Sequence, residues 1–203
     1  MSTNEFNKEY YLVYGTNNPN CPAVELDEDK NGADFRRIKT PIENCGLVKM
    51  RIIEPYPKTP EMTDFHQNGI VSFFSKKIYD KINSIVVSGV QFLLGEIRNP
   101  KNNNIYENYY YLHIYSYINC LDRELSELDS NARTGMVRSI SKIVLDTEVL
   151  SKIPLQERLI FRLGEMSAFQ LFHKSVVDAI MATEPTGIRF VKVEDYHTGS
   201  AFD

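Results

Sequence analysis

Four histidines have side chains that could bind a metal ion or move a proton near neutral pH. They are His66, His113, His173 and His197. Zinc sites and metalloproteases space their histidines closely, as in HExxH, and none of the four has such a neighbour. We therefore interpret them as structural or surface residues, and we expect neither a metal ion nor a cofactor.

The cysteines do not indicate covalent chemistry either. Cys21, Cys45 and Cys120 are odd in number and far apart, so they build neither a disulfide framework nor a CxxC metal site. Cys120 follows a predicted strand, where a buried thiol is commoner than a nucleophile. The phosphate-binding motifs GxxxxGKS/T and GxGxxG and the nucleophile elbow GxSxG are absent from the sequence. The sequence therefore predicts a protein that is not an enzyme, in a reducing compartment.

Carboxylates are concentrated in two short polar stretches, residues 25–29 and 122–129. The first lacks the glycine and the terminal glutamate of an EF-hand loop, so a solvated loop is the simplest interpretation. A surface that binds a basic partner is the alternative, because charge complementarity speeds association. The candidate partner-binding residues are Asp27, Glu28, Asp29, Asp122, Glu124, Glu127 and Asp129.

Alternation along residues 105–118 places several tyrosines on one face of a strand. Tyr109, Tyr111, Tyr115 and Tyr117 share that face with His113. Tyrosine is enriched at protein interfaces, so this face could bind a partner. We favour the other interpretation, in which helices of the protein cover it.

The charge balance excludes some partners. The chain has 27 acidic and 23 basic residues and a net charge of −4, which is not the basic footprint of a nucleic-acid-binding protein. No run of 18 apolar residues predicts a membrane span, and Met1–Lys8 lacks the apolar stretch of a secretory signal. We expect a soluble cytoplasmic protein that weakly favours basic partners.

The N-terminal part is predicted to contain two strands and a long loop. The strands are Tyr10–Tyr14 and Leu47–Ile53, and residues 15–34 are expected to be an exposed loop. Pro55, Pro57 and Pro60 then end regular structure. We place a candidate boundary there, between residues 1–60 and 61–203, although the whole chain could be one compact domain.

An internal repeat is the most informative pattern. Residues 70–96 and 168–194 align without a gap at an offset of 98. Each copy predicts strand, helix, turn and strand, with Ser75 as an N-cap and Gly89 or Gly187 in the turn. In the second copy His173 stands where Ser75 stands in the first, so its cap is expected to be weaker or shifted to Ser175. The identical pairs are Phe74/Phe172, Lys76/Lys174, Asp80/Asp178, Ile82/Ile180, Gly89/Gly187, Phe92/Phe190 and Glu96/Glu194.

The remaining segments complete an α+β fold with a mixed or antiparallel sheet and two related strand-helix-strand repeats. Residues 105–118 predict a strand that is central or bulged, and residues 121–135 a polar loop or short helix. Ile140–Leu145 and Leu159–Leu163 predict two further strands.

Several short motifs together resemble a known family. They are the Phe-Ser-helix pattern in 71–82, Gly-Val-Gln-Phe at 89–92, Tyr-Tyr-Tyr-Leu-His-Ile at 109–114, Cys-Leu-Asp at 120–122, Leu-Ile-Phe-Arg-Leu at 159–163 and Thr-Gly-Ile-Arg-Phe at 186–190. With the opening Tyr10-Tyr11-Leu12, they resemble the bacterial immunity proteins of immunity family eleven, which carries domain of unknown function 1629. The resemblance is strongest from about residue 68 to 193.

This resemblance implies a protein that neutralises a toxin, commonly a nuclease, of a polymorphic, type VI or contact-dependent system. It transfers no catalytic or toxin-contact residue. The expected mechanism is stoichiometric binding of a basic cognate toxin, without nucleic acid or membrane as partner. Two alternatives remain open: an immunity protein that enzymatically reverses the toxin's modification, and an accessory or adaptor protein of a secretion apparatus.

Overall fold

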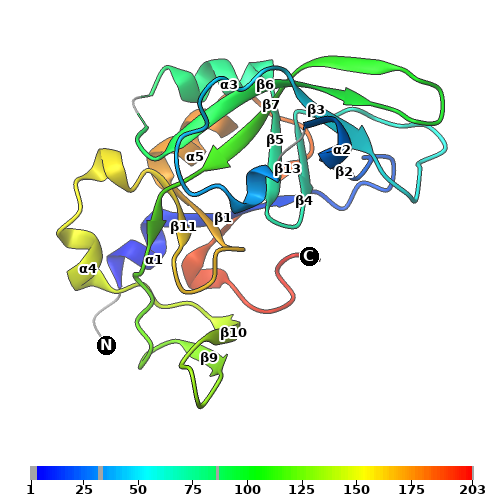
Figure 1. Cartoon of the computed structure of the whole chain (residues 1–203). Helices are drawn as coiled ribbons and strands as arrows, with labels where there is room; N and C mark the ends of the chain where they lie inside the picture. Colours follow the sequence, from blue (N-terminus) through cyan, green and yellow to red (C-terminus); the bar gives the residue numbers. More distant parts are fainter. Residues whose placement is uncertain (1–3, 32–33, 86, 203) are drawn as a thin grey trace.

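The computed structural model describes residues 4–31, 34–85 and 87–202 and has the α+β architecture that the sequence predicts (Figure 1). The helices are α1 (Glu5–Glu9), α2 (Glu28–Asn31), α3 (Lys76–Asn83), α4 (Thr147–Ser151) and α5 (Lys174–Met181), with 3-10 turns at Phe35–Arg37, Leu155–Glu157 and Val193–Asp195. The strands are β1 (Tyr10–Gly15), β2 (Val24–Leu26), β3 (Val48–Ile52), β4 (Phe65–Asn68), β5 (Val71–Ser75), β6 (Val90–Arg98), β7 (Ile105–Ile114), β8 (Tyr117–Ile118), β9 (Glu127–Ser130), β10 (Val137–Lys142), β11 (Ile160–Leu163), β12 (Gln170–His173) and β13 (Ile188–Lys192).

The described strands form two sheets and a separate hairpin. One sheet has the order β13-β1-β12-β11-β8, the other β2-β3-β6-β7-β5-β4, and β9 pairs only with β10. Neighbours run antiparallel except for two parallel pairs, β8–β11 and β3–β6. The sheets are therefore mixed and mostly antiparallel, as expected. None of the described helices has the length and apolar character that spanning a membrane requires.

Residues 70–96 and 168–194 have the same order of elements, β5-α3-β6 and β12-α5-β13. Helices α3 and α5 are offset by 98 residues, and both Gly89 and Gly187 have φ of +77°. Ser75 occupies the N-cap of α3, but its hydroxyl donates to Asp64 Oδ1 (2.7 Å) instead of capping the helix. Of the two outcomes expected for the second helix, the shift to Ser175 is wrong, because His173 Nδ1 itself caps α5 by accepting from the Ser175 N–H at 3.2 Å.

A third strand lies between the two strands of each segment, and its register is the same in both. β7 separates β5 from β6, and β1 separates β12 from β13. Phe74 pairs with Tyr110 just as Phe172 pairs with Tyr11. The two units also touch at matching positions, since α3 packs on α5 and Ser72 Oγ donates to Gln170 Oε1 at 3.1 Å.

The tyrosine face of β7 is buried, but not by the helices. Tyr109 and Tyr111 pack with Phe35, Ile38 and Tyr56 from the N-terminal segment. The helix α3 covers the opposite face, where Tyr79 stacks on Tyr110 with ring centroids 3.9 Å apart. The expected cover by repeat helices is therefore wrong for this face, because the segment after residue 34 supplies enough apolar surface to occupy it.

The expected exposed loop at 15–34 is also partly wrong. It contains β2 and α2, and Val24 and Leu26 enter the core beside Phe35. Similarly, the polar segment 121–135 contains β9, and the strand expected at 140–145 starts earlier, as β10 at Val137. In both cases a strand is too short for its alternation to stand out within a polar segment.

Candidate functional site

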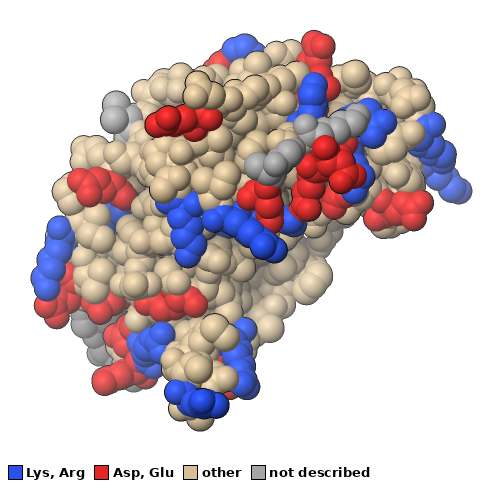
Figure 2. All heavy atoms as spheres, viewed as in Figure 1, with Lys and Arg blue, Asp and Glu red and all other residues tan. Residues whose placement is uncertain are grey.

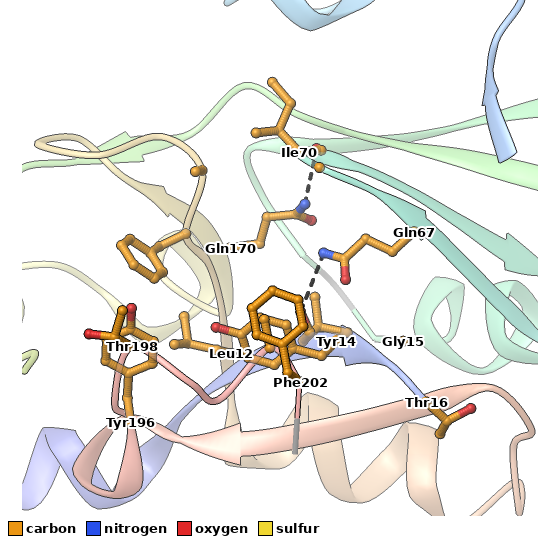
Figure 3. Close-up of a pocket in the computed structure, with 15 residues that line it drawn as sticks. Leu12, Tyr14, Gly15, Thr16, Gln67, Ile70, Gln170, Tyr196, Thr198 and Phe202 are labelled. Carbon is orange, nitrogen blue, oxygen red and sulfur yellow. Dashed lines mark hydrogen bonds between the residues drawn. The ribbon is translucent and has the colours of Figure 1, made fainter. Parts of the chain in front are cut away.

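A hollow of about 570 Å³ lies where the two sheets meet (Figure 3). One wall is the end of β1 with Thr16, and the others are the β4–β5 turn, the segment before β12 and the C-terminal residues 196–202. Gln67 and Gln170 reach into it from opposite walls, and Phe202 lies at its front. Phe202 is 81% exposed, Gln170 is buried and Gln67 is half-buried, so the hollow combines an apolar rim with two amides that are at least partly covered.

The two amides of this hollow are already bonded within the chain. Gln170 Nε2 donates to Ile70 O at 3.0 Å, and Gln67 Nε2 donates to Val13 O at 3.4 Å. Burial raises the pKa of Tyr14 to about 12, and the Arg189 guanidinium lies 5.1 Å from the centre of its ring. A neutral phenol and two internally bonded amides can contact a partner, but they are not a nucleophile with its base.

A cysteine and a histidine meet elsewhere, near the β4 edge. Cys21 Sγ lies 3.5 Å from His66 Nδ1 and 3.4 Å from Thr63 Oγ1. His66 Nε2 accepts from the Thr63 N–H, so the ring proton sits on Nδ1 and points to Pro22 O at 3.2 Å. Burial raises the pKa of Cys21 and lowers that of His66 to about 4. The pair therefore consists of a thiol and a neutral imidazole, the opposite of a nucleophilic dyad.

The remaining reactive groups have structural roles. His113 Nε2 lies 2.8 Å from Thr40 O, and burial lowers its pKa. Cys120 is buried, and burial raises its pKa. The three cysteines are free thiols. Among the described residues no three His, Cys, Asp or Glu side chains gather into a group that could hold a metal ion.

The first predicted acidic stretch does not form one exposed acidic surface. Asp27 is only 3% exposed, and its carboxylate lies 3.9 Å from Arg98. Glu28 is exposed and bonded to Arg36, while Glu25 pairs with Arg51. Asp29 is exposed, and within the described residues it has no ion-pair partner.

The second acidic stretch lies on and before the β9–β10 hairpin. Glu124, Glu127 and Asp129 are exposed, whereas Asp122 is half-buried and accepts from the Glu124 and Leu125 amides. The hairpin also carries basic residues, which Figure 2 shows at the lower end of the molecule. They are Arg133, Arg138 and Lys142. The described part of the chain contains no ion pair between these cations and the three exposed carboxylates, so the hairpin presents both charges to a partner.

The sequence did not reveal the hollow, because its walls come from four segments that only the tertiary fold brings together. Tyr14 and Gln170 belong to predicted strands, but nothing in their local pattern indicates that β1 inserts beside β12. The sequence shows an aromatic residue, Phe202, in the C-terminal segment, but only the structure shows that its side chain is exposed beside the hollow.

A comparison with known families identifies the chain over most of its length. A family model matches residues 24–195, from the first residue of β2 to the last residue of the 3-10 turn after β13. No curated protein matches the chain. Because the family model covers well over half of the 203 residues, the chain belongs to the Immunity protein family (Imm11).

Proposed function

We propose that this immunity protein binds a cognate bacterial toxin domain one to one and blocks its activity. The family match over residues 24–195 carries the immunity role. Inhibition by binding is supported by the state of the reactive side chains described above. Cys21 is a protonated thiol beside a neutral His66, and this pair lacks the thiolate that nucleophilic catalysis needs. Chemistry on the toxin's target would need an activated group instead.

The proposed toxin is a nuclease or another effector that acts in the cytoplasm, delivered by a type VI or contact-dependent system. The three free thiols fit a reducing compartment. The net charge of −4 fits a basic toxin, since opposite charge speeds encounter. We propose the exposed residues Asp29, Glu124, Glu127 and Asp129 as rim contacts.

The buried Asp27 no longer belongs to this proposed rim. We do not propose Glu28 and Asp122 as direct rim contacts, since the carboxylate of each already accepts hydrogen bonds within the chain. The basic residues of the hairpin would then set the orientation of the toxin, because like charges opposed across an interface are unfavourable.

Titration of toxin activity tests the mechanism. The toxin domain encoded by the gene immediately upstream should lose its activity at one equivalent of this protein, and light scattering should give a 1:1 complex. Inhibition at a small fraction of one equivalent would indicate turnover and favour the enzymatic alternative. If the two proteins do not bind at all, the immunity assignment to that toxin is wrong.

Charge reversal tests the rim. Changing Glu124, Glu127 and Asp129 to Lys should slow association several-fold at low salt, while dissociation changes little. The difference should shrink as salt shortens the screening length to about 8 Å near physiological strength. Reversal of Glu148, an exposed carboxylate on α4 that pairs with Lys152, is the control. Equal association rates for all variants at low salt would contradict the electrostatic part of the proposal.

A further inference from the structure

Strand β6 is paired along its whole length on one side but only partly on the other. It pairs with β7 from Val90 to Arg98. On the opposite side β3 joins it only from the Val48–Gly95 pair onward. The two strands therefore form a fork, and residues 90–94 are the open edge inside it.

The backbone groups that point into this fork can be identified. The Tyr115 N–H donates to Gly89 O at 3.0 Å. Gly89 and Tyr115 are therefore a hydrogen-bonded pair that extends the β6–β7 ladder by one residue on each strand. Because antiparallel ladders alternate, residues 91 and 93 face β7, and the N–H and C=O groups of Val90 and Phe92 point away from it. Within the described residues no backbone group bonds to them on that side.

Two hollows flank the open edge. One of about 410 Å³ lies between residues 45–47 and residues 92–94. Another of about 250 Å³ lies between the end of α3 and the same strand, with Tyr79 and Ile82 in its wall. Leu47 and Leu94 are 42% and 46% exposed at the fork. An added strand would thus find backbone partners and apolar space for its side chains.

The composition of this edge differs from that of the edge strands β13 and β2, whereas the shorter edge strands β4 and β8 are also uncharged. Free strand edges are usually protected by charged residues, especially lysine. The edge strand β13, at the matching position of the second unit, carries Arg189 and Lys192, and the edge strand β2 carries Glu25. Residues 90–94 read Val-Gln-Phe-Leu-Leu and carry no charge. An uncharged apolar edge is the kind that an interacting chain covers.

We propose that the fork between β3 and β6 binds an extended apolar segment of the cognate toxin as an added β-strand. This inference rests on the proposed function and names its contact surface. A small molecule or a helix could not satisfy a row of strand backbone groups. A second copy is disfavoured because β6 lies between residues 45–47 and α3, so two such recessed edges could not reach each other.

Hydrogen exchange and a matched pair of variants test the proposal, with the toxin domain encoded immediately upstream as the probe. The amides of Val90 and Phe92 should exchange at least tenfold more slowly in the complex. Leu94→Lys should weaken toxin binding at least tenfold. Met181→Lys, at a residue of α5 with the same 46% exposure, should change binding less than twofold. Both variants should keep the wild-type melting temperature within a few degrees.

The outcomes separate this inference from the function on which it rests. If the toxin binds but exchange at residues 90–94 is unchanged and Leu94→Lys binds normally, the fork is not the contact surface, although the immunity function stands. If the protein alone forms a dimer that protects these amides and Leu94→Lys dissociates it, the occupant is a second copy and the proposal is wrong. If neither the wild type nor Met181→Lys binds the toxin, the proposed function itself fails.

Discussion

At the residue scale, His66 shows how the fold buries a titratable side chain and gives it a structural role. Its ring is buried, and both nitrogens are occupied by backbone groups of Thr63 and Pro22. Nε2 accepts a hydrogen bond, so a second proton would oppose the Thr63 N–H. The Tyr109 hydroxyl donates to Thr63 O at 2.8 Å and fixes the same segment from the other side. The ring therefore joins β4 to the N-terminal segment as a neutral base.

This neutral state predicts acid sensitivity. Burial lowers the pKa of His66 from 6.5 to about 4, so the unfolded chain takes up the proton first as the pH falls. The stabilisation is fully present above pH 6.5 and is lost as the pH falls towards 4, by about 3 kcal/mol in total. Urea unfolding at pH 7.5, 6 and 5 should show a fall in unfolding free energy. The lowered pKa values of His113 and His173 act in the same direction.

Two variants isolate the contribution of His66. His66→Gln removes the titrating group, so its unfolding free energy should depend less on pH than that of the wild type, even if it is lower at pH 7.5. His66→Asn, which also lacks a titrating ring, should show the same reduced dependence. An unchanged pH dependence in His66→Gln would show that His66 is not the group responsible.

At the scale of elements, the turn after each long helix depends on glycine. Gly187 has φ of +77°, and a Cβ there would lie 2.2 Å from Thr63 Oγ1 and 2.9 Å from Phe65 O. Gly69 also has a positive φ, but a Cβ there would meet nothing within 4 Å. Both positions have a positive φ, which strains any residue other than glycine, but only Gly187 lacks room for a Cβ atom. The turn before β13 therefore approaches the start of β4 as closely as a glycine permits.

This contrast predicts different costs for the same substitution. Gly69→Ala should lower the unfolding free energy by about 1 kcal/mol, the cost of a left-handed alanine. Gly187→Ala should lose about 2 kcal/mol more, because Thr63 and the β4 backbone must move. Urea unfolding of both variants gives the comparison. Equal losses would mean that the turn can shift away from Thr63 without strain.

Elements with a clear local pattern could be predicted from the sequence, whereas their pairing could not. The helix faces and the turn glycines of both units follow from residue spacing within a few turns of chain. The insertion of β1 between β12 and β13 joins residues about 160 to 180 positions apart, and no local pattern encodes it. For the same reason Asp27 looked like part of a solvated loop, although β2 carries it to the edge of the core beside Arg98.

At the scale of the whole molecule, the net charge of −4 results from acidic and basic side chains that are mixed on the face seen in Figure 2. Figure 2 shows acidic and basic side chains interspersed over the face in view. Among the described residues two ion pairs bridge adjacent strands of the six-stranded sheet, Lys49–Glu96 and Arg51–Glu25. Both pairs are half-buried near the surface, where ion pairs add little stability. On this face the charges therefore form no single acidic patch, and we expect the shape of the surface to contribute more than net charge to the specificity of the proposed complex.

The two parts suggested by the proline cluster share both sheets. β1 is an inner strand of the five-stranded sheet, and β3 pairs with β6 in the six-stranded sheet. Residues of the N-terminal segment such as Phe35 and Tyr56 cover Tyr111. We therefore propose that the chain folds as one domain, the second of the two arrangements that the sequence allows.

Truncation tests this proposal. A fragment of residues 61–203 lacks the strand that bonds to both β12 and β13, so those strands lose their shared partner and the Tyr109–Tyr111 face becomes exposed. Unpaired strand edges and an uncovered apolar face favour aggregation. The fragment should lack cooperative urea unfolding and a dispersed amide spectrum. A chain ending at residue 196 is the control, because it leaves every strand in place although it loses the bonds from Arg189 to Ser200 O and from Asn17 to Phe202 O, so it should unfold cooperatively. A folded 61–203 fragment with a sharp unfolding transition would instead support the division at residue 60.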